Sequence, residues 1–189
     1  MDINSIPPIS TKMTSEQFYA LPEDGKRYEL IEGEVDVAPS PSMEHQRLSI
    51  RLAYALMKYF ERKPVGEVLT APMDVELDAA NVYQPDLIVV LEENSRILTK
   101  ARVVGAPDLI VEILSSGTAM KDRNVKLQRY AKAGVREAWL ADPARRRFEI
   151  YRLRDDKRYA HVETVEEGGT LTTPMLPGLR IKVARLFME

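Results

Sequence analysis

Two carboxylates lie inside apolar runs, where an unpaired charge is costly. Asp86 heads the run Leu-Ile-Val-Val-Leu at 87–91, and Glu112 lies in the middle of the run at 109–114. If each run is a strand, alternation leaves both of its faces apolar, which is typical of a central strand covered on both sides. Removing a carboxylate from water there costs several kcal/mol unless a proton, a partner or a metal compensates. The two acids therefore require a chemical explanation.

Neighbouring strands would bring Asp86 and Glu112 together at one face of a sheet. Two buried like charges repel, so a protein that keeps both ionised needs a cation between them. Because the chain has no cysteine and only two histidines, oxygen ligands favour Mg²⁺ or Mn²⁺. The structural alternative is that one carboxylate caps a strand and the other pairs with an arginine. Asp108 is about 13 Å from Glu112 along a strand, too far to share one ion, and we expect it to cap the strand start.

The helices and strands that must position these acids do not alternate regularly along the chain. A helix at 42–62 precedes strand runs at 66–77, 82–91 and 107–115, and a helix at 119–133 and a strand at 135–141 follow. The first three strands are joined directly, which does not fit a doubly wound parallel fold. We expect a mixed α/β sheet with a helix on each face. Hairpins extend both ends, the first around Glu32-Gly33. Residues 1–13 are expected to form a flexible tail before a single domain at 14–189.

Each predicted helix carries a functional candidate near the sheet. His45 lies one turn before Leu48 on the buried stripe of the helix at 42–62. It is either a histidine packed at the helix start or a ligand or proton-transfer group. Lys126 falls about 40° from Tyr130 on a helical wheel, at the edge of the inner stripe. Its stem can lie on apolar surface while its amine reaches the sheet, and the alternative is a solvated helix lysine.

Together these residues resemble a known nuclease pattern. Pro85-Asp86 followed by Glu112-Ile113-Leu114, in a helix, three strands, helix, strand order, resembles the PD-(D/E)xK nuclease superfamily. The chain from about 13 to 187 more closely resembles the Uma-two family of restriction-endonuclease-like proteins. The resembling segments are RYELIEGEV, EHQRL, YQPDLIVV, PDLIVEILSSGT, KLQRYAKAGV and EAWLADP. The resemblance implies a restriction-endonuclease-like fold in which Asp86 and Glu112 hold a divalent ion.

The resemblance also implies roles for further residues. A lysine usually lies two residues after the glutamate in such nucleases, but Leu114 occupies that position here. Lys126, four residues before Tyr130, resembles the Gln-x-x-x-Tyr helix motif of RecB-like members, and we interpret it as a relocated lysine. Further candidates in family-like blocks are Glu29, Glu32 and His45. Glu29 is favoured because it lies in a β-like run, whereas Glu32 is equally explained as an exposed acid in a turn.

The expected function is metal-dependent hydrolysis of DNA phosphodiester bonds. A metal polarises the phosphate and lowers the pKa of a bound water, and a lysine stabilises developing charge or orients the nucleophile. Asp86, Glu112 and Lys126 would be the catalytic residues, with Mg²⁺ or Mn²⁺ as the cofactor. The leucine at Leu114 favours the alternative, an inactive nuclease-fold module that binds nucleic acid or a protein partner.

Charge and composition limit the partners. The formal net charge of −2 argues against a wholly basic nucleic-acid binder, so DNA contacts would rest on local patches. The segment 121–136 contains six basic residues and one acidic residue, and the segment 145–158 contains seven basic residues and three acidic residues. Such runs could neutralise phosphates, although a solvated surface explains them nearly as well. The lack of cysteine, signal peptide and membrane span fits a cytoplasmic protein. A two-fold homodimer would suit cutting of two strands, and no segment indicates its interface.

Overall fold

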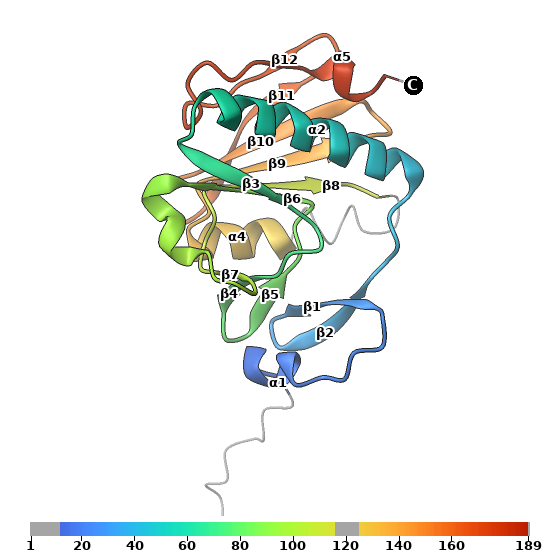
Figure 1. Cartoon of the computed structure of the whole chain (residues 1–189), viewed down its shortest axis with the longest axis vertical. Helices are drawn as coiled ribbons and strands as arrows, with labels where there is room; N and C mark the ends of the chain where they lie inside the picture. Colours follow the sequence, from blue (N-terminus) through green and yellow to red (C-terminus); the bar gives the residue numbers. More distant parts are fainter. Residues whose placement is uncertain (1–11, 116–124, 189) are drawn as a thin grey trace, which may run out of the picture.

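A six-stranded mixed sheet forms the centre of the computed structural model, which describes residues 12–115 and 125–188 (Figure 1). Its strand order is β11-β10-β9-β8-β6-β3. The bounds are β3 Gly66–Thr70, β6 Leu87–Leu91, β8 Leu109–Ile113, β9 Glu137–Asp142, β10 Arg147–Leu153 and β11 Tyr159–Val165. β8 and β9 run parallel, and the other neighbouring strands run antiparallel. The predicted mixed α/β fold is confirmed.

One helix covers each face of this sheet (Figure 1). α2 (Met43–Arg62) is capped by the side chain of Ser42 and buries one apolar stripe. The stripe includes Leu48, Leu52, Ala53, Leu56 and Phe60. α4 (Leu127–Ala133) covers the other face and ends at Gly134, which has a φ of 104° that favours glycine. The predicted helix on each face is therefore present.

Strand β8 contributes to both layers of the core. Leu109, Val111 and Ile113 pack in the apolar cluster that includes α2, whereas Ile110 packs in the cluster that includes α4. Alternation directs Glu112 to the same side as Ile110. Both faces of the strand are apolar, as predicted, and the carboxylate of Glu112 lies on the α4 side.

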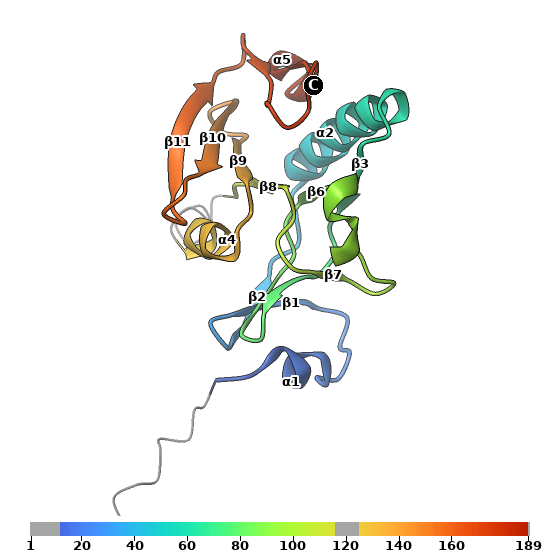
Figure 2. The ribbon, with the colours of Figure 1, turned by 90° about the vertical axis from the view of Figure 1, so that its left-hand side faces the viewer.

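A second sheet is built from five short strands in the order β2-β1-β5-β4-β7 (Figure 2). Their bounds are β1 Arg27–Ile31, β2 Glu34–Ala38, β4 Val75–Asp78, β5 Asn81–Tyr83 and β7 Val103–Val104. β1 and β2 form the hairpin predicted around Glu32-Gly33, in which Gly33 has a φ of 82°. The N-terminal hairpin prediction is confirmed.

The strand runs predicted at 66–77 and 82–91 are each divided between the two sheets. β3 and β6 belong to the six-stranded sheet, whereas β4 and β5 pair with each other in the second sheet. The prediction that each of these two runs forms one continuous strand was therefore wrong. Pro72 and Pro85 lie in the two breaks, and a proline lacks the N–H that a continuous ladder needs. As a result, Asp86 lies at the point where the chain crosses from one sheet to the other.

Shorter elements complete the described chain. They are α1 Ser15–Tyr19, η1 Glu92–Ile97, β12 Thr170–Leu171, β13 Ile181–Lys182 and α5 Val183–Leu186. α5 lies on the same side of the large sheet as α2 (Figure 1). Most of the predicted tail, 1–11, and the first part of the helix predicted at 119–133, 119–124, lie outside the described residues. Within the described ranges, no helix is both long and apolar enough to span a membrane.

Candidate active site

Asp86 and Glu112 lie at the same end of two paired strands. β6 and β8 are antiparallel with Leu87 opposite Val111, so one further step in this register sets Asp86 opposite Glu112. The Oδ2 atom of Asp86 accepts a hydrogen bond of 2.7 Å from the backbone N–H of Ile113. The structure therefore brings together the two acids that the sequence placed on neighbouring strands.

Glu112 is buried, with 5% of its surface exposed, and its carboxylate contacts two side chains from the α4 segment. Its Oε1 atom accepts a hydrogen bond of 2.5 Å from the Tyr130 hydroxyl and lies 3.4 Å from the Lys126 Nζ. Burial raises the pKa of Tyr130 well above its usual value, and the charges of Glu112 and Glu29 raise it further. Tyr130 therefore stays protonated at neutral pH and remains a donor to Glu112.

The ammonium of Lys126 lies between two carboxylates. Its Nζ is 2.9 Å from Oε1 of Glu29 and 3.4 Å from Oε1 of Glu112, and only 7% of the residue is exposed. The same ammonium is 5.9 Å from the centroid of the Tyr83 ring, within range of a cation–π contact. Leu114 packs instead in the apolar cluster around α4. Lys126 is thus a buried lysine of the site and not a solvated helix lysine.

Glu29 reaches the site from the second sheet. It lies in β1, it is 5% exposed, and besides Lys126 it accepts a hydrogen bond of 2.9 Å from the backbone N–H of Gln84. Gln84 is followed by Pro85 and Asp86, so this bond ties β1 to the crossover that carries Asp86. The preference for Glu29 over Glu32 agrees with these contacts.

His45 approaches Asp86 from the opposite face of the large sheet. It lies in the first turn of α2, where its backbone N–H donates to the Ser42 hydroxyl at 3.2 Å. Its Nε2 atom is 3.1 Å from Oδ1 of Asp86, and its Nδ1 atom is buried without a hydrogen-bond partner among the described residues. His45 is therefore directed at a site carboxylate and is more than a histidine packed at a helix start.

Two other acids lie away from this group. Glu32 is in the β1–β2 turn with a φ of 54°, it forms an ion pair with Arg129, and 42% of its side chain is exposed. Asp108 accepts a hydrogen bond of 2.8 Å from the Leu91 backbone N–H, near the other end of the β6–β8 pair, and pairs with Arg136. Glu32 is a partly exposed acid of a turn, and it is not among the residues that line the cavity around Asp86 and Glu112. Asp108 has the structural role that was predicted for it.

The site residues line a cavity of about 360 Å³. Its walls come from β1, the loop before α2, the start of β6, the end of β8 and the start of α4. The lining consists of Arg27, Glu29, Ala38, Pro39, Ser40, Pro41, Ser42, His45, Gln84, Asp86, Glu112, Ile113, Ser115 and Lys126. Tyr130 is not among them; it is fully buried and donates a hydrogen bond to Glu112, which does line the cavity. The cavity contains most of the predicted candidates.

Arg27 and Gln84 also line the cavity, and the sequence interpretation missed both. Arg27 lies two residues before Glu29 in β1, so strand alternation places the two side chains on one face, and this signal was available. Its guanidinium donates to the Pro39 carbonyl at 3.0 Å. The sequence gives no such indication for Gln84, because Gln84 contributes a backbone N–H, which donates a hydrogen bond to the carboxylate of Glu29.

The donor set of the cavity fits a hard divalent cation. Three carboxylates, Glu29, Asp86 and Glu112, share the lining with two cationic side chains, Arg27 and Lys126, so acids are in excess. Residues 12–115 and 125–188 contain no cluster of three or more carboxylate or imidazole groups arranged as metal ligands. Mg²⁺ is commonly bound by one or two carboxylates, with water and substrate phosphate completing its shell. Asp86 and Glu112, from neighbouring strands, are the two carboxylates of the lining that could bind such an ion.

The fold and the site define a restriction-endonuclease-like protein. The αβββαβ core places two acids at the ends of β6 and β8, and the α4 segment places the ammonium of Lys126 beside one of them, Glu112. The chain belongs to the Uma2 family, whose model, described as "Putative restriction endonuclease", matches residues 15–184.

The proteins to which this chain is similar include one known from its sequence and one solved structure. One is the "Uncharacterized protein sll1609" of Synechocystis sp., which is 26% identical over 149 residues, covering 77% of this chain and 83% of that protein. The other is a crystal structure described as a "putative nuclease belonging to DUF820" from Anabaena variabilis. It superposes with a TM-score of 0.78 at 20% identity over 93% of this chain and 97% of that one. This second similarity supports the fold.

Proposed function

We propose that the protein is a metal-dependent endonuclease that hydrolyses DNA phosphodiester bonds. The observation that carries the proposal is the convergence of Asp86, Glu112 and Lys126 in one cavity of about 360 Å³. Membership of a family described as "Putative restriction endonuclease" supports the same class of reaction. The name of the Anabaena variabilis protein, a "putative nuclease", agrees with it.

Asp86 and Glu112 are the residues that would hold Mg²⁺ or Mn²⁺. Such an ion polarises a phosphoryl oxygen and lowers the pKa of a bound water toward neutrality. The protein keeps both carboxylates in place through a backbone N–H on Asp86 and a tyrosine hydroxyl on Glu112. Preorganised donors of this kind need no rearrangement when charge develops on the substrate.

Lys126 supplies the positive charge that a lysine two residues after Glu112 would usually supply, since Leu114 occupies that position here. Its ammonium lines the cavity beside Glu112, where it can stabilise charge on a phosphate oxygen or orient the attacking water. Glu29 and Tyr130 are positioning residues: Glu29 holds Lys126, and Tyr130 holds Glu112. His45 has a similar effect on Asp86 through Oδ1.

The direct test is nicking of supercoiled plasmid DNA by the purified protein in the presence of Mg²⁺. We expect the wild-type protein to cut and Glu112→Gln to lose at least about 100-fold in rate, because the substitution removes a charge that binds the ion. Glu32→Gln is the matched control, since it removes an acid of a neighbouring block that lies outside the cavity. Equal cutting by the wild type and Glu112→Gln would refute the assignment.

The second candidate function is a module that binds nucleic acid without cutting it. It is favoured by the close contacts of Lys126 with both Glu29 and Glu112, which could make the lysine a structural ion-pair partner. Thermal unfolding with and without Mn²⁺ separates the two functions, because a ligand that binds the folded state raises the melting temperature. Stabilisation by Mn²⁺ favours the enzyme, and DNA binding without such stabilisation favours the module.

A further inference from the structure

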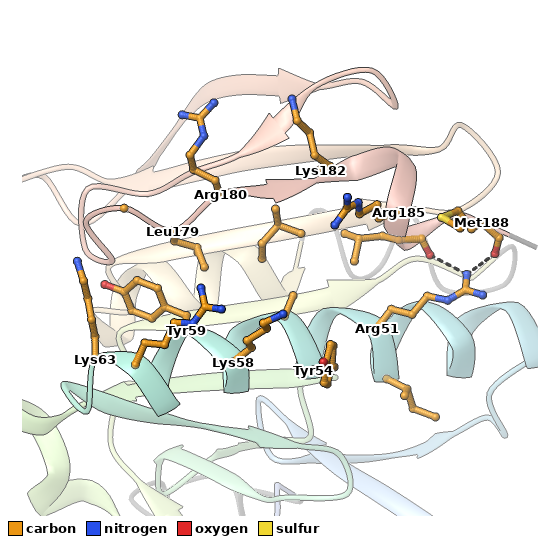
Figure 3. A pocket seen from close by; sticks show the side chains of 16 residues that line it. Arg51, Tyr54, Lys58, Tyr59, Lys63, Leu179, Arg180, Lys182, Arg185 and Met188 are labelled. Carbon is orange, nitrogen blue, oxygen red and sulfur yellow. Dashed lines mark hydrogen bonds between the residues drawn. The ribbon is translucent and has the colours of Figure 1, made fainter.

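A basic groove lies between α2 and the C-terminal segment, away from the candidate active site (Figure 3). Its volume is about 1080 Å³. Seven basic residues line it, namely Arg51, Lys58, Arg62, Lys63, Arg180, Lys182 and Arg185. Among the described residues that form its walls, none is acidic. This is a concentration of positive charge on a chain whose formal net charge is −2.

Most of these cations have no acidic partner among the described residues. Lys58, Arg62, Arg180, Lys182 and Arg185 are exposed and form no ion pair within the part of the chain that the structure describes. By contrast, six of the seven basic residues at 145–158 are paired with acids. Like charges held close together repel one another, and a bound polyanion would offset that repulsion. The charge that was expected to serve DNA at 145–158 is largely neutralised, whereas the charge in the groove is not.

The two walls of the groove are tied to each other. The Arg51 guanidinium donates to the backbone carbonyl of Leu186 at 3.1 Å and also to that of Met188. At the other end of α2, the Lys63 ammonium donates to the Pro177 carbonyl at 2.7 Å, and the Tyr59 hydroxyl donates to the same carbonyl at 3.3 Å. These contacts join α2 to the C-terminal segment near both ends of the groove, and none of them uses Lys58, Arg62, Arg180, Lys182 or Arg185.

Aromatic surface accompanies the charge. Tyr54 is 65% exposed on α2, and the Lys58 ammonium is 6.0 Å from the centroid of its ring. An exposed ring beside cations is the arrangement on which single-stranded bases stack while their phosphates are neutralised. A double helix would hide the faces of its bases from such a ring. The groove therefore fits a single strand better than a duplex.

The groove is connected to the active-site cavity along α2. A cavity of about 370 Å³ lies between them and shares Ile50 and Tyr54 with the groove. It shares His45 and Asp86 with the active-site cavity. At 1.5 Å per residue, the helix from His45 to Arg62 spans about 25 Å, which is long enough for several nucleotides to lie along it.

We infer that this groove binds a single-stranded flank of the nucleic-acid substrate and leads it along α2 toward Asp86. The inference rests on the proposed function for the substrate class, since it assumes that the polyanion is nucleic acid. Exposed cations from both walls would contact the phosphates, and Tyr54 would stack on a base.

The test is fluorescence anisotropy with an oligodeoxythymidine of about 20 nucleotides, measured in EDTA so that nothing is cut. Lys58→Glu/Lys182→Glu reverses one charge on each wall. The matched control is Lys100→Glu/Lys157→Glu, which makes the same charge change at exposed lysines outside the groove. We expect at least tenfold weaker binding for the groove variant and less than twofold for the control. The slope of log K against log salt should become shallower by about 1.4 in the groove variant only, since each lost phosphate contact contributes about 0.7.

The identity of the occupant is tested in the same assay. Tyr54→Ala should weaken binding about tenfold, whereas Tyr54→Phe should bind as the wild type does, because stacking needs the ring and not the hydroxyl. Equal losses in the groove and control lysine variants would overturn the inference, as would displacement of the oligonucleotide by an equal charge concentration of polyglutamate. Binding in EDTA does not depend on cutting. If Mg²⁺-dependent nicking fails while the groove variant still loses binding, the groove stands and the nuclease proposal falls.

Discussion

Among the individual residues, Lys126 is central to the candidate site, because its ammonium contacts two of the carboxylates there. It lies 2.9 Å from Glu29 and 3.4 Å from Glu112, and all three residues are buried. The ammonium is within ion-pair distance of both carboxylates, and removing a cationic partner from a buried acid is costly. Lys126 therefore has a structural role in addition to the catalytic role that we propose for it.

Lys126→Met separates these two roles. In EDTA we expect the variant to lose about 3 kcal/mol of unfolding free energy, because Glu29 and Glu112 are left facing each other. The double variant Lys126→Met/Glu29→Gln should recover much of that loss, since one of the two charges is removed. Urea denaturation measures both changes. Nicking should stay absent in both variants, and recovery of cutting with recovery of stability would show that Lys126 is only structural.

Individual residues also show the limits of sequence interpretation. Asp86 and Glu112 could be paired in advance because each is the lone acid of an apolar run. Lys126 could be proposed because it lies at the edge of the inner stripe of its helix and resembles the Gln-x-x-x-Tyr motif. The role of Gln84 could not be predicted, since it acts through a backbone N–H. Glu32 and Glu29 are three residues apart, and only the turn conformation at Glu32 separates the exposed acid from the buried one.

At the scale of elements, α2 links the two sites. Its first turn carries His45 to Asp86, and its exposed side forms one wall of the basic groove. Its position depends on the apolar stripe that packs on β6 and β8. The helix bounds and most of the stripe were predictable from periodicity. The split of the runs at 66–77 and 82–91 was not predicted, since the apolar pattern continues on both sides of Pro72 and Pro85.

Leu52→Ala tests how strongly α2 is held. Leu52 is fully buried, and we expect the truncation to lower the unfolding free energy by about 2–5 kcal/mol through lost burial and a cavity. Met57→Ala on the same helix, where the side chain is 52% exposed, should change it by less than about 0.5 kcal/mol. Urea denaturation distinguishes them. A loss below about 1 kcal/mol for Leu52→Ala would mean that α2 is not anchored as described.

At the scale of the whole molecule, the basic groove is a concentration of positive charge that no run of sequence reveals. The cations of the groove come from 51–63 and 180–185, two segments that are far apart in the chain. The acidic residue Glu61 interrupts the first segment, so that segment does not stand out as a basic run. Among the described residues of the basic runs that are visible in the sequence, most are instead paired with acids. The tertiary structure was needed to find the groove, because it depends on which cations lack an acidic neighbour.

Stability of the whole molecule should fall at alkaline pH. Burial raises the pKa values of Tyr83 and Tyr130 above those of the unfolded chain, and nearby carboxylates add to the shift. Above about pH 10, the unfolded state loses these protons while the folded state keeps them, so folding stability decreases as pH rises. The slope is at most about 1.4 kcal/mol per pH unit for each tyrosine. Denaturation from about pH 8 to 11 should give a shallower decline for Tyr83→Phe, and an unchanged decline would contradict the burial of its hydroxyl.

The central claim is that Asp86 and Glu112 together hold a divalent ion. A crystal grown with Mn²⁺ tests it most directly, through anomalous density that locates the ion without reference to activity. We predict a single strong peak within bonding distance of both carboxylates, about 2.0–2.3 Å from their oxygens, and its loss in a Glu112→Gln crystal. No peak between Asp86 and Glu112, at a Mn²⁺ concentration that supports DNA cutting, would contradict the account.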